Sequence, residues 1–178
     1  MERRIPEARL DDVGSGLVPV SPGWFVVNVR EAAWVTSEAW GARCLFEADE
    51  PVLRGRTDFM SDRFPQLGFK LAVFEPGQPS GLYHADSAEE DFLVLHGECI
   101  ALVENEERPM RQWDFLHCAS GTHHGFTGSG DGPCVLLMVG SRIAGRTFDY
   151  PAQEAKSSDE AYLGYPEWRP GLRPNVFS

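Results

Sequence analysis

The sequence has few basic residues, and it contains no long apolar run. Its 16 Lys and Arg residues stand against 27 Asp and Glu residues, which gives a formal net charge of −11. This balance argues against nucleic acid and anionic membrane surfaces as partners, because both attract basic proteins. No apolar run approaches the length of a membrane-spanning helix, and the charged segment at residues 1–6 does not resemble a secretory signal peptide.

Cysteine is also scarce. The four cysteines have no CxxC spacing, and they fall in or near predicted strands: Cys44, Cys99, Cys118 and Cys134. We expect four buried free thiols that pack as small apolar side chains. A reducing cytoplasm is therefore the expected location of the protein.

Short apolar segments separated by turn residues fill the middle of the chain. They recur at intervals of roughly ten residues, which is typical of a β-sandwich or a closed barrel. No segment between residues 66 and 142 has a helical period. The predicted strands are residues 69–74, 82–86, 92–96, 99–104, 110–118, a run that begins at 123, and 134–140.

Two histidines and two carboxylates in this region are candidate metal ligands: His84, Asp86, Glu90 and His124. Side chains alternate across a strand, so His84 and Asp86 share one face. Imidazole nitrogens and carboxylate oxygens suit first-row divalent metals better than a thiolate-preferring ion. The sequence therefore predicts a site for one divalent transition metal: Fe, Mn, Ni or Zn.

The region from about residue 69 to 140 resembles a cupin domain, which is a double-stranded β-helix or jelly-roll barrel. His84 stands six positions before Glu90, and Glu90 is followed by six residues and Gly97, as in the first cupin motif. Gly121 and His124 match the second motif in register. The sequence departs from the second motif where the family has a first Gly, a Pro and an Asn, which are replaced by Trp113, Ala119 and Gly128.

The resemblance implies that His84, Glu90 and His124 bind the metal near the mouth of the barrel. Asp86 stands where the family usually has a second histidine, and we take it as the fourth ligand. Its carboxylate has three possible roles: direct ligand, ligand through a water, or acceptor that supports another ligand. His123 is adjacent to His124 and is expected to point outward.

Three apolar residues share the parity of the ligands and are expected to wall the pocket: Phe92, Val94 and Phe126. The alternative to a metal is a buried hydrogen-bonded network of the same polar residues. Two neighbouring carboxylates would then repel, and one would take up a proton. A divalent cation compensates their burial directly, which favours the metal.

The length of 178 residues fits one domain with extensions. We expect an N-terminal extension over residues 1–65, whose strands join the barrel or a partner. The barrel core then spans residues 66–142, and residues 143–178 form a tail that packs on the barrel or a partner. The resemblance also implies a homodimer.

Several finer expectations concern the flanks. Residues 24–29 and 43–47 are predicted strands, and residues 30–40 form a short helix or a loop with one turn. In the tail, residues 152–161 are weakly helical, and the expected anchors are Tyr165 and Trp168.

The expected function is that of a small-molecule metalloenzyme. Fe(II) would support dioxygenase-like chemistry, and Zn, Mn or Ni would support lyase or isomerase chemistry as a Lewis acid. One alternative is a non-catalytic cupin that binds a small ligand. Another is a metal-free isomerase or epimerase in which His and carboxylate groups act as acid and base. The ligand set is compatible with each of these chemistries.

Overall fold

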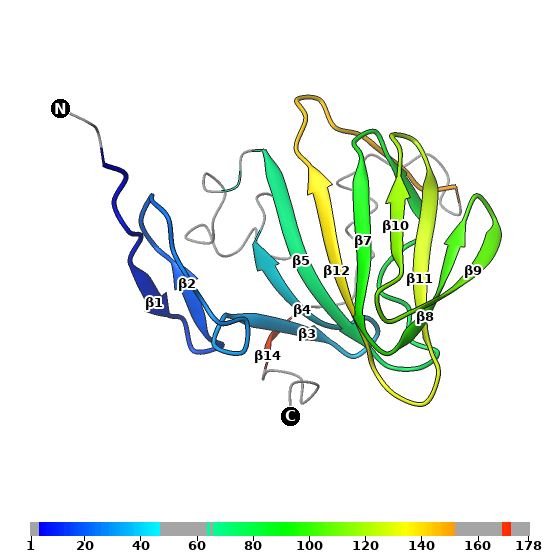
Figure 1. The fold of residues 1–178 in the computed structure, drawn as a ribbon, viewed down its shortest axis with the longest axis horizontal. Helices are drawn as coiled ribbons and strands as arrows, with labels where there is room; N and C mark the ends of the chain where they lie inside the picture. The colour runs from blue at the N-terminus through cyan, green and yellow to red at the C-terminus, as the bar shows by residue number, and fades with distance from the viewer. Residues whose placement is uncertain (1–3, 47–63, 65, 152–168, 172–178) are drawn as a thin grey trace.

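The structure, a computed structural model, describes residues 4–46, 64, 66–151 and 169–171 (Figure 1). Over these residues the secondary structure consists of β-strands without a helix. The predicted all-β fold is therefore confirmed. Within the same ranges no helix is long and apolar enough to cross a membrane. Residues 152–161, Tyr165 and Trp168 lie outside the described residues, so the expectations placed on them stay predictions.

A seven-stranded antiparallel sheet forms one wall of the barrel. In spatial order its strands are β10 (Phe115–Cys118), β7 (Glu90–His96), β12 (Cys134–Ser141), β5 (Leu67–Phe74), β4 (Gly41–Phe46), β3 (Trp34–Ser37) and β14 (Arg169–Gly171). Residues of β7 alternate between buried and less buried, as in a sheet with one buried face, whereas four consecutive residues of β4 are buried.

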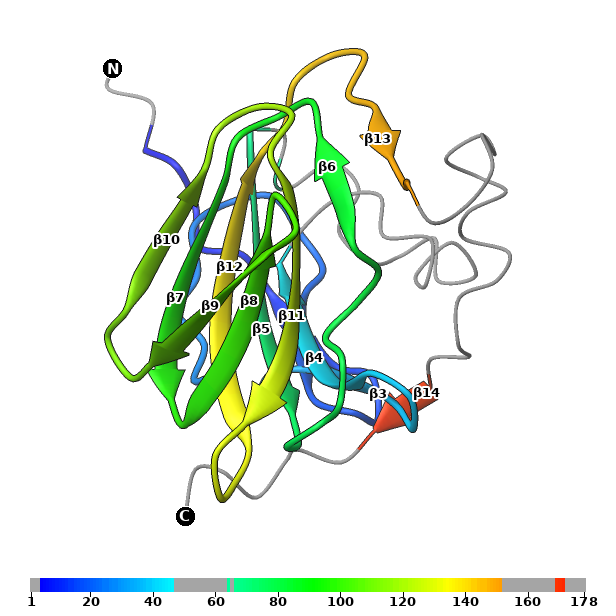
Figure 2. The same ribbon diagram turned by 90° about the vertical axis from the view of Figure 1, so that its right-hand side faces the viewer.

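A five-stranded antiparallel sheet forms the facing wall, with β13 beside β6 at its edge (Figure 2). In spatial order its strands are β13 (Phe148–Asp149), β6 (His84–Asp86), β11 (His123–Ser129), β8 (Glu98–Val103) and β9 (Glu106–Arg111). A separate hairpin of β1 (Leu10–Asp12) and β2 (Leu17–Pro19) lies at the far end of the molecule from β8 and β9 (Figure 1).

The inner faces of the two large sheets bury a common core. On β7 the residues with inward parity, Glu90, Phe92 and Val94, are all buried, and the residues between them are less buried. This alternation places an ionisable residue in the same row as core side chains. The buried core cluster is Ala72, Phe74, Phe92, Val94, Cys99, Ala101, Met110, Cys118, Phe126, Cys134, Leu136 and Met138.

The predicted strand at residues 24–29 is wrong. Of these residues only Trp24 makes a β-bridge, with Glu7, and Val26 is 80% exposed. Val27 and Val29 instead pack against the outer face of the seven-stranded sheet, around buried Trp34. The indole N–H of Trp34 donates to the Val29 carbonyl oxygen at 2.9 Å, so the segment is held by a side chain rather than by a strand ladder.

Two further expectations need correction. Residues 30–40 do not form a helix, because β3 occupies Trp34–Ser37 and pairs with β4. The predicted single strand at 110–118 is divided into the end of β9 and the whole of β10. Trp113 lies between them with a positive φ of 76°, a conformation that ends a strand ladder.

Candidate metal centre

The two barrel sheets together supply a compact group of three potential ligands. His84 on β6 and His124 on β11 are direct register partners in the five-stranded sheet. Glu90 begins β7 in the facing sheet. One ligand atom from each of the three residues lies within 4.8 Å of the other two. The structure thus brings together three of the four residues that the sequence predicts as ligands.

Backbone hydrogen bonds orient both imidazoles. The Nδ1–H of His84 donates to the Leu82 carbonyl oxygen at 2.8 Å, and the Nδ1–H of His124 donates to the Thr122 carbonyl oxygen at 3.0 Å. A histidine that donates from Nδ1 keeps the Nε2 lone pair available for a metal. These Nε2 atoms lie 3.9 Å (His84) and 3.2 Å (His124) from Glu90 Oε2.

Glu90 Oε2 is a buried polar atom without a hydrogen-bond partner among the described residues. It faces two imidazole nitrogens, so three lone-pair-bearing atoms converge on one small volume. With both imidazoles neutral, such an arrangement is costly unless a cation lies between the atoms. The residues therefore fit a divalent metal with nitrogen and oxygen ligands.

The charges within this group follow from burial and mutual contact. Burial raises the pKa of Glu90. Contact with His124 and the positive charge of Lys70 outweigh burial, and together they lower the pKa from 4.5 to about 2. Burial and the positive charge of His124 lower the pKa of His84 to about 4 from 6.5. Without a metal, Glu90 is therefore ionised and His84 is neutral at neutral pH.

His124 differs from His84 in its protonation. Burial lowers the pKa of His124, but contacts with the Cys118 thiol and the Glu90 carboxylate outweigh burial and bring it to about 10 from 6.5. A proton on His124 then supplies the positive charge beside Glu90 when no metal is bound. Cys118, which the sequence indicates only as a buried thiol, pairs with Glu90 in the β10–β7 register.

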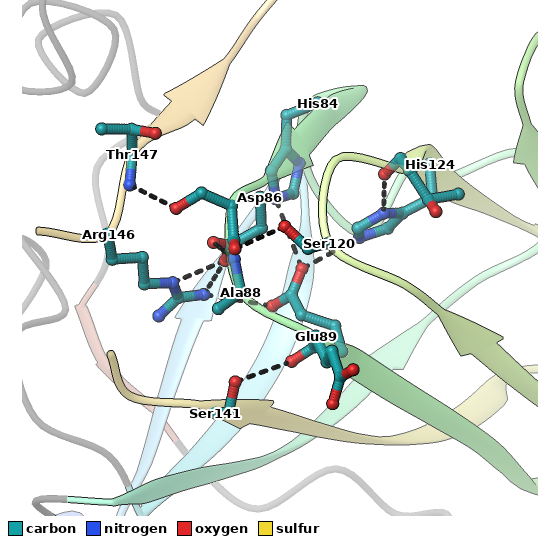
Figure 3. Close-up of polar contacts among 12 residues, drawn as sticks. His84, Asp86, Ala88, Glu89, Ser120, His124, Ser141, Arg146 and Thr147 are labelled. Carbon is teal, nitrogen blue, oxygen red and sulfur yellow. Dashed lines mark hydrogen bonds and ion pairs between the residues drawn. The ribbon is translucent and has the colours of Figure 1, made fainter. Parts of the chain in front are cut away.

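Asp86 lies next to the three ligands but faces away from them. Its Oδ2 accepts hydrogen bonds from the Nε of Arg146, at 2.6 Å, and from the Nη2 of the same residue. Its Oδ1 accepts from the backbone N–H of Ala88 at 2.9 Å. Figure 3 shows Arg146 reaching Asp86 on the side away from His124. In this structure the Asp86 carboxylate is thus an ion-pair partner of Arg146 and lies outside the three-atom group.

Sequence reasoning did not identify Arg146. It follows β12 in the connection to β13, and its sequence position is 60 residues from Asp86. No motif marks such a contact. The signal for such a partner comes from the structure. Asp86 is 2% exposed, and a buried carboxylate requires a compensating positive charge.

The aromatic residues predicted to wall the pocket pack against His124. The Phe92 ring centroid lies 4.9 Å from that of His124 and 4.6 Å from that of Phe126. Val94 is buried one step deeper along β7, opposite Leu136. Tyr150, which directly follows β13, also lines the site, because its ring stacks on that of His84 with the centroids 5.5 Å apart.

The other histidines lie away from the group. His123 points outward, stacks on Tyr83 at 5.7 Å, and its Nε2 hydrogen-bonds to Asp149 Oδ2 at 2.9 Å. His117 is exposed and lies 2.7 Å from Asp91, and His96 is also exposed. Alternation along β11 therefore assigns His123 and His124 to opposite faces.

The comparison with protein families identifies one domain. Residues 70–140 match the family described as the cupin domain. No curated protein matches the chain at a significant level.

Several solved structures are similar to parts of the chain. One is a protein from Acidithiobacillus ferrooxidans with the provisional name of sugar phosphate isomerase, at 31% identity and a TM-score of 0.47. That match covers 49% of this chain and 58% of the other, so the chain spans less than two thirds of that relative. A sugar phosphate isomerase of the cupin superfamily from Silicibacter pomeroyi is 23% identical over 64% of this chain and 74% of its own, with a TM-score of 0.48.

A third match is a cupin 2 conserved barrel domain protein from Salinispora arenicola. It is 20% identical over 42% of this chain and 61% of its own, with a TM-score of 0.39. Residues 70–140 thus match the cupin domain family, and within them His84, Glu90 and His124 could hold a metal ion.

Proposed function

We propose that the chain binds one divalent transition metal and acts as a small-molecule metalloenzyme. The ligand atoms are the Nε2 of His84, the Nε2 of His124 and the Oε2 of Glu90. The observation that supports this proposal is the buried Glu90 Oε2, which lacks a hydrogen-bond partner within the described ranges and faces both imidazoles. A bound metal ion at this point takes the place of the proton that His124 carries without a metal, and it removes the repulsion among the three lone pairs.

The protein residues hold, orient and shield the centre. Two imidazoles and one carboxylate leave coordination positions open, and the bound ion supplies either dioxygen chemistry as Fe(II) or Lewis-acid polarisation as Zn, Mn or Ni. The carbonyl oxygens of Leu82 and Thr122 fix the ring orientations of the two histidines. Phe92 and Phe126 exclude water from the side of the site that faces the core.

Metal content is the direct test. Elemental mass spectrometry on untagged protein should find about one equivalent of a single transition metal per chain, and His124→Ala should lose it. His123→Ala is the matched control, because His123 is the adjacent histidine and points outward. A wild-type protein that takes up none of Fe, Mn, Ni and Zn would contradict the proposal.

A second candidate is metal-free acid–base chemistry. The observation in its favour is the protonated His124 beside ionised Glu90, with pKa values of about 10 and about 2. These two groups form an ion pair that could exchange a proton with a substrate. This candidate predicts that turnover survives a chelator, whereas turnover by the metalloenzyme does not.

We also propose that the chain forms a homodimer through the β10 edge of the seven-stranded sheet. Large apolar side chains are exposed at its β10 edge, with Trp113 at 69% and Phe115 at 62%. Phe115 pairs with partly buried Leu93 in the β10–β7 register, so this apolar edge extends to β7. Light scattering after gel filtration should give twice the mass of the chain, and Phe115→Ser should reduce it to one chain.

A cytoplasmic location remains part of the proposal. All four cysteines are free and buried, which fits a reducing compartment. Cell fractionation that finds the protein with cytoplasmic markers would support it.

A further inference from the structure

Asp86 and Arg146 form a buried ion pair beside the candidate metal ligands. Asp86 shares a strand face with His84, so its side chain starts from a position suited to ligation. Its carboxylate is nevertheless held by Arg146 and by the Ala88 N–H. The Arg146 guanidinium is itself held above the Phe148 ring at 4.7 Å, and Phe148 is the register partner of Asp86.

The same guanidinium contacts one of the two carboxylate oxygens of Glu90 and leaves the other oriented toward the histidines. Arg146 Nη2 lies 3.2 Å from Glu90 Oε1 and also contacts Asp86 Oδ2. Glu90 Oε2 is thereby left as the oxygen that faces the two imidazoles. The planar fork of arginine can contact two carboxylates at once, whereas the single ammonium of lysine is a point charge.

We infer that Arg146 is a positioning residue that keeps the Asp86 carboxylate and Glu90 Oε1 out of the metal's coordination sphere. This inference rests on the proposed function. The chain then offers three ligand atoms, and the remaining positions stay open for substrate.

The charge balance of the site follows from this arrangement. The Asp86–Arg146 pair is neutral, so within the described part of the chain Glu90 is the negative charge of this site that remains to oppose a divalent metal. The bound centre keeps a net charge of +1, which preserves its ability to polarise an oxygen atom of the substrate. A second carboxylate ligand would cancel that charge and occupy an open position.

Cobalt(II) titration of untagged metal-free protein tests the inference, because the visible absorption of Co(II) reports its coordination number. In Arg146→Gln the freed Asp86 should join the ligand set, so Co(II) should bind about tenfold more tightly and absorb less strongly per ion. Adding Asp86→Asn to this variant should reverse both changes. Arg146→Lys, which keeps the charge but lacks the fork, should lie between wild type and Arg146→Gln.

Arg108→Gln is the matched control, because Arg108 is an exposed arginine that pairs with Glu106 on β9. It should leave the Co(II) affinity and spectrum unchanged. The inference is overturned if Arg146→Gln and Arg146→Lys both keep the wild-type spectrum, or if their affinity changes persist after Asp86→Asn. Failure of the wild-type protein to bind Co(II) would overturn the proposed function as well, so the two failures are distinguishable.

Discussion

The two ends of the barrel interior share strand β7 but have opposite chemistry. The polar end consists of His84, Asp86, Glu90, His124 and Arg146. The apolar end consists of Phe74, Val94, Cys99, Cys134 and Leu136, all of them buried. On β7 the change from Glu90 to Val94 takes four residues, which is about 13 Å along a strand.

This contrast separates stability from chemistry. The apolar end packs side chains from both sheets and has no charge to compensate. The polar end contains two buried carboxylates, Asp86 and Glu90, which are compensated by Arg146 and by a positive charge at the three-residue group, either a proton on His124 or a bound ion. Substitutions at the apolar end should therefore change the free energy of unfolding, and substitutions at the polar end should change metal affinity.

The largest effect is expected at the apolar end. Leu136→Ala removes a fully buried side chain that lies between Ala72 and Val94, and should lower the free energy of unfolding by about 2–5 kcal/mol. Urea denaturation measures this change, with Ile143→Ala as the control because Ile143 is 49% exposed. The folded variant should keep its metal content, and a loss of metal would show that the two ends are not separable.

At the polar end, Glu90→Gln should weaken metal binding roughly 100-fold, or by about 3 kcal/mol, because a neutral amide replaces the one anionic ligand. Glu89→Gln is the matched control, since Glu89 is the adjacent exposed glutamate. Competition with a chelator measures both affinities. Equal affinities in the two variants would remove Glu90 from the ligand set.

The pH dependence of metal affinity should be steeper than that of an ordinary histidine site near neutrality. His124, with a pKa of about 10, must release a proton before it binds a metal, whereas His84 is already neutral above a pH of about 4. Affinity should therefore rise about tenfold per pH unit between about pH 5 and about pH 9, with one proton released per metal. Calorimetry in buffers of different ionisation enthalpy counts this proton, and a flat profile would contradict the assigned protonation of His124.

The smallest effect is expected from a single methyl group at Gly140. A Cβ at this position would lie 3.2 Å from Glu90 Oε1, which is tighter than usual packing and would shift the carboxylate. Gly140→Ala should weaken metal binding by about fivefold, or close to 1 kcal/mol. Gly132→Ala is the control, because a Cβ there would have open space around it. Identical affinities in the two variants would mean that Glu90 can move freely.

Local sequence patterns predict the barrel strands and the grouping of His84, Glu90 and His124, because both depend on short-range spacing. Alternation along β7 and β11 assigns Glu90 and His124 to the inner face, and Gly97 after β7 and Gly121 before β11 lie in the adjoining turns. Residues 24–29 were misassigned because an irregular segment that packs two valines on a sheet has the same alternation as a strand. Arg146 was missed because its contact with Asp86 depends on how β13 pairs with β6, which no local pattern encodes.

The three candidate ligands are divided between the two barrel sheets. His84 and His124 belong to the five-stranded sheet, and Glu90 belongs to the seven-stranded sheet. The site therefore cannot exist until the two sheets have closed on each other, so its assembly belongs to a late step of folding. A bound ion would then cross-link the two sheets, and metal release would be coupled to the rate at which the sheets separate.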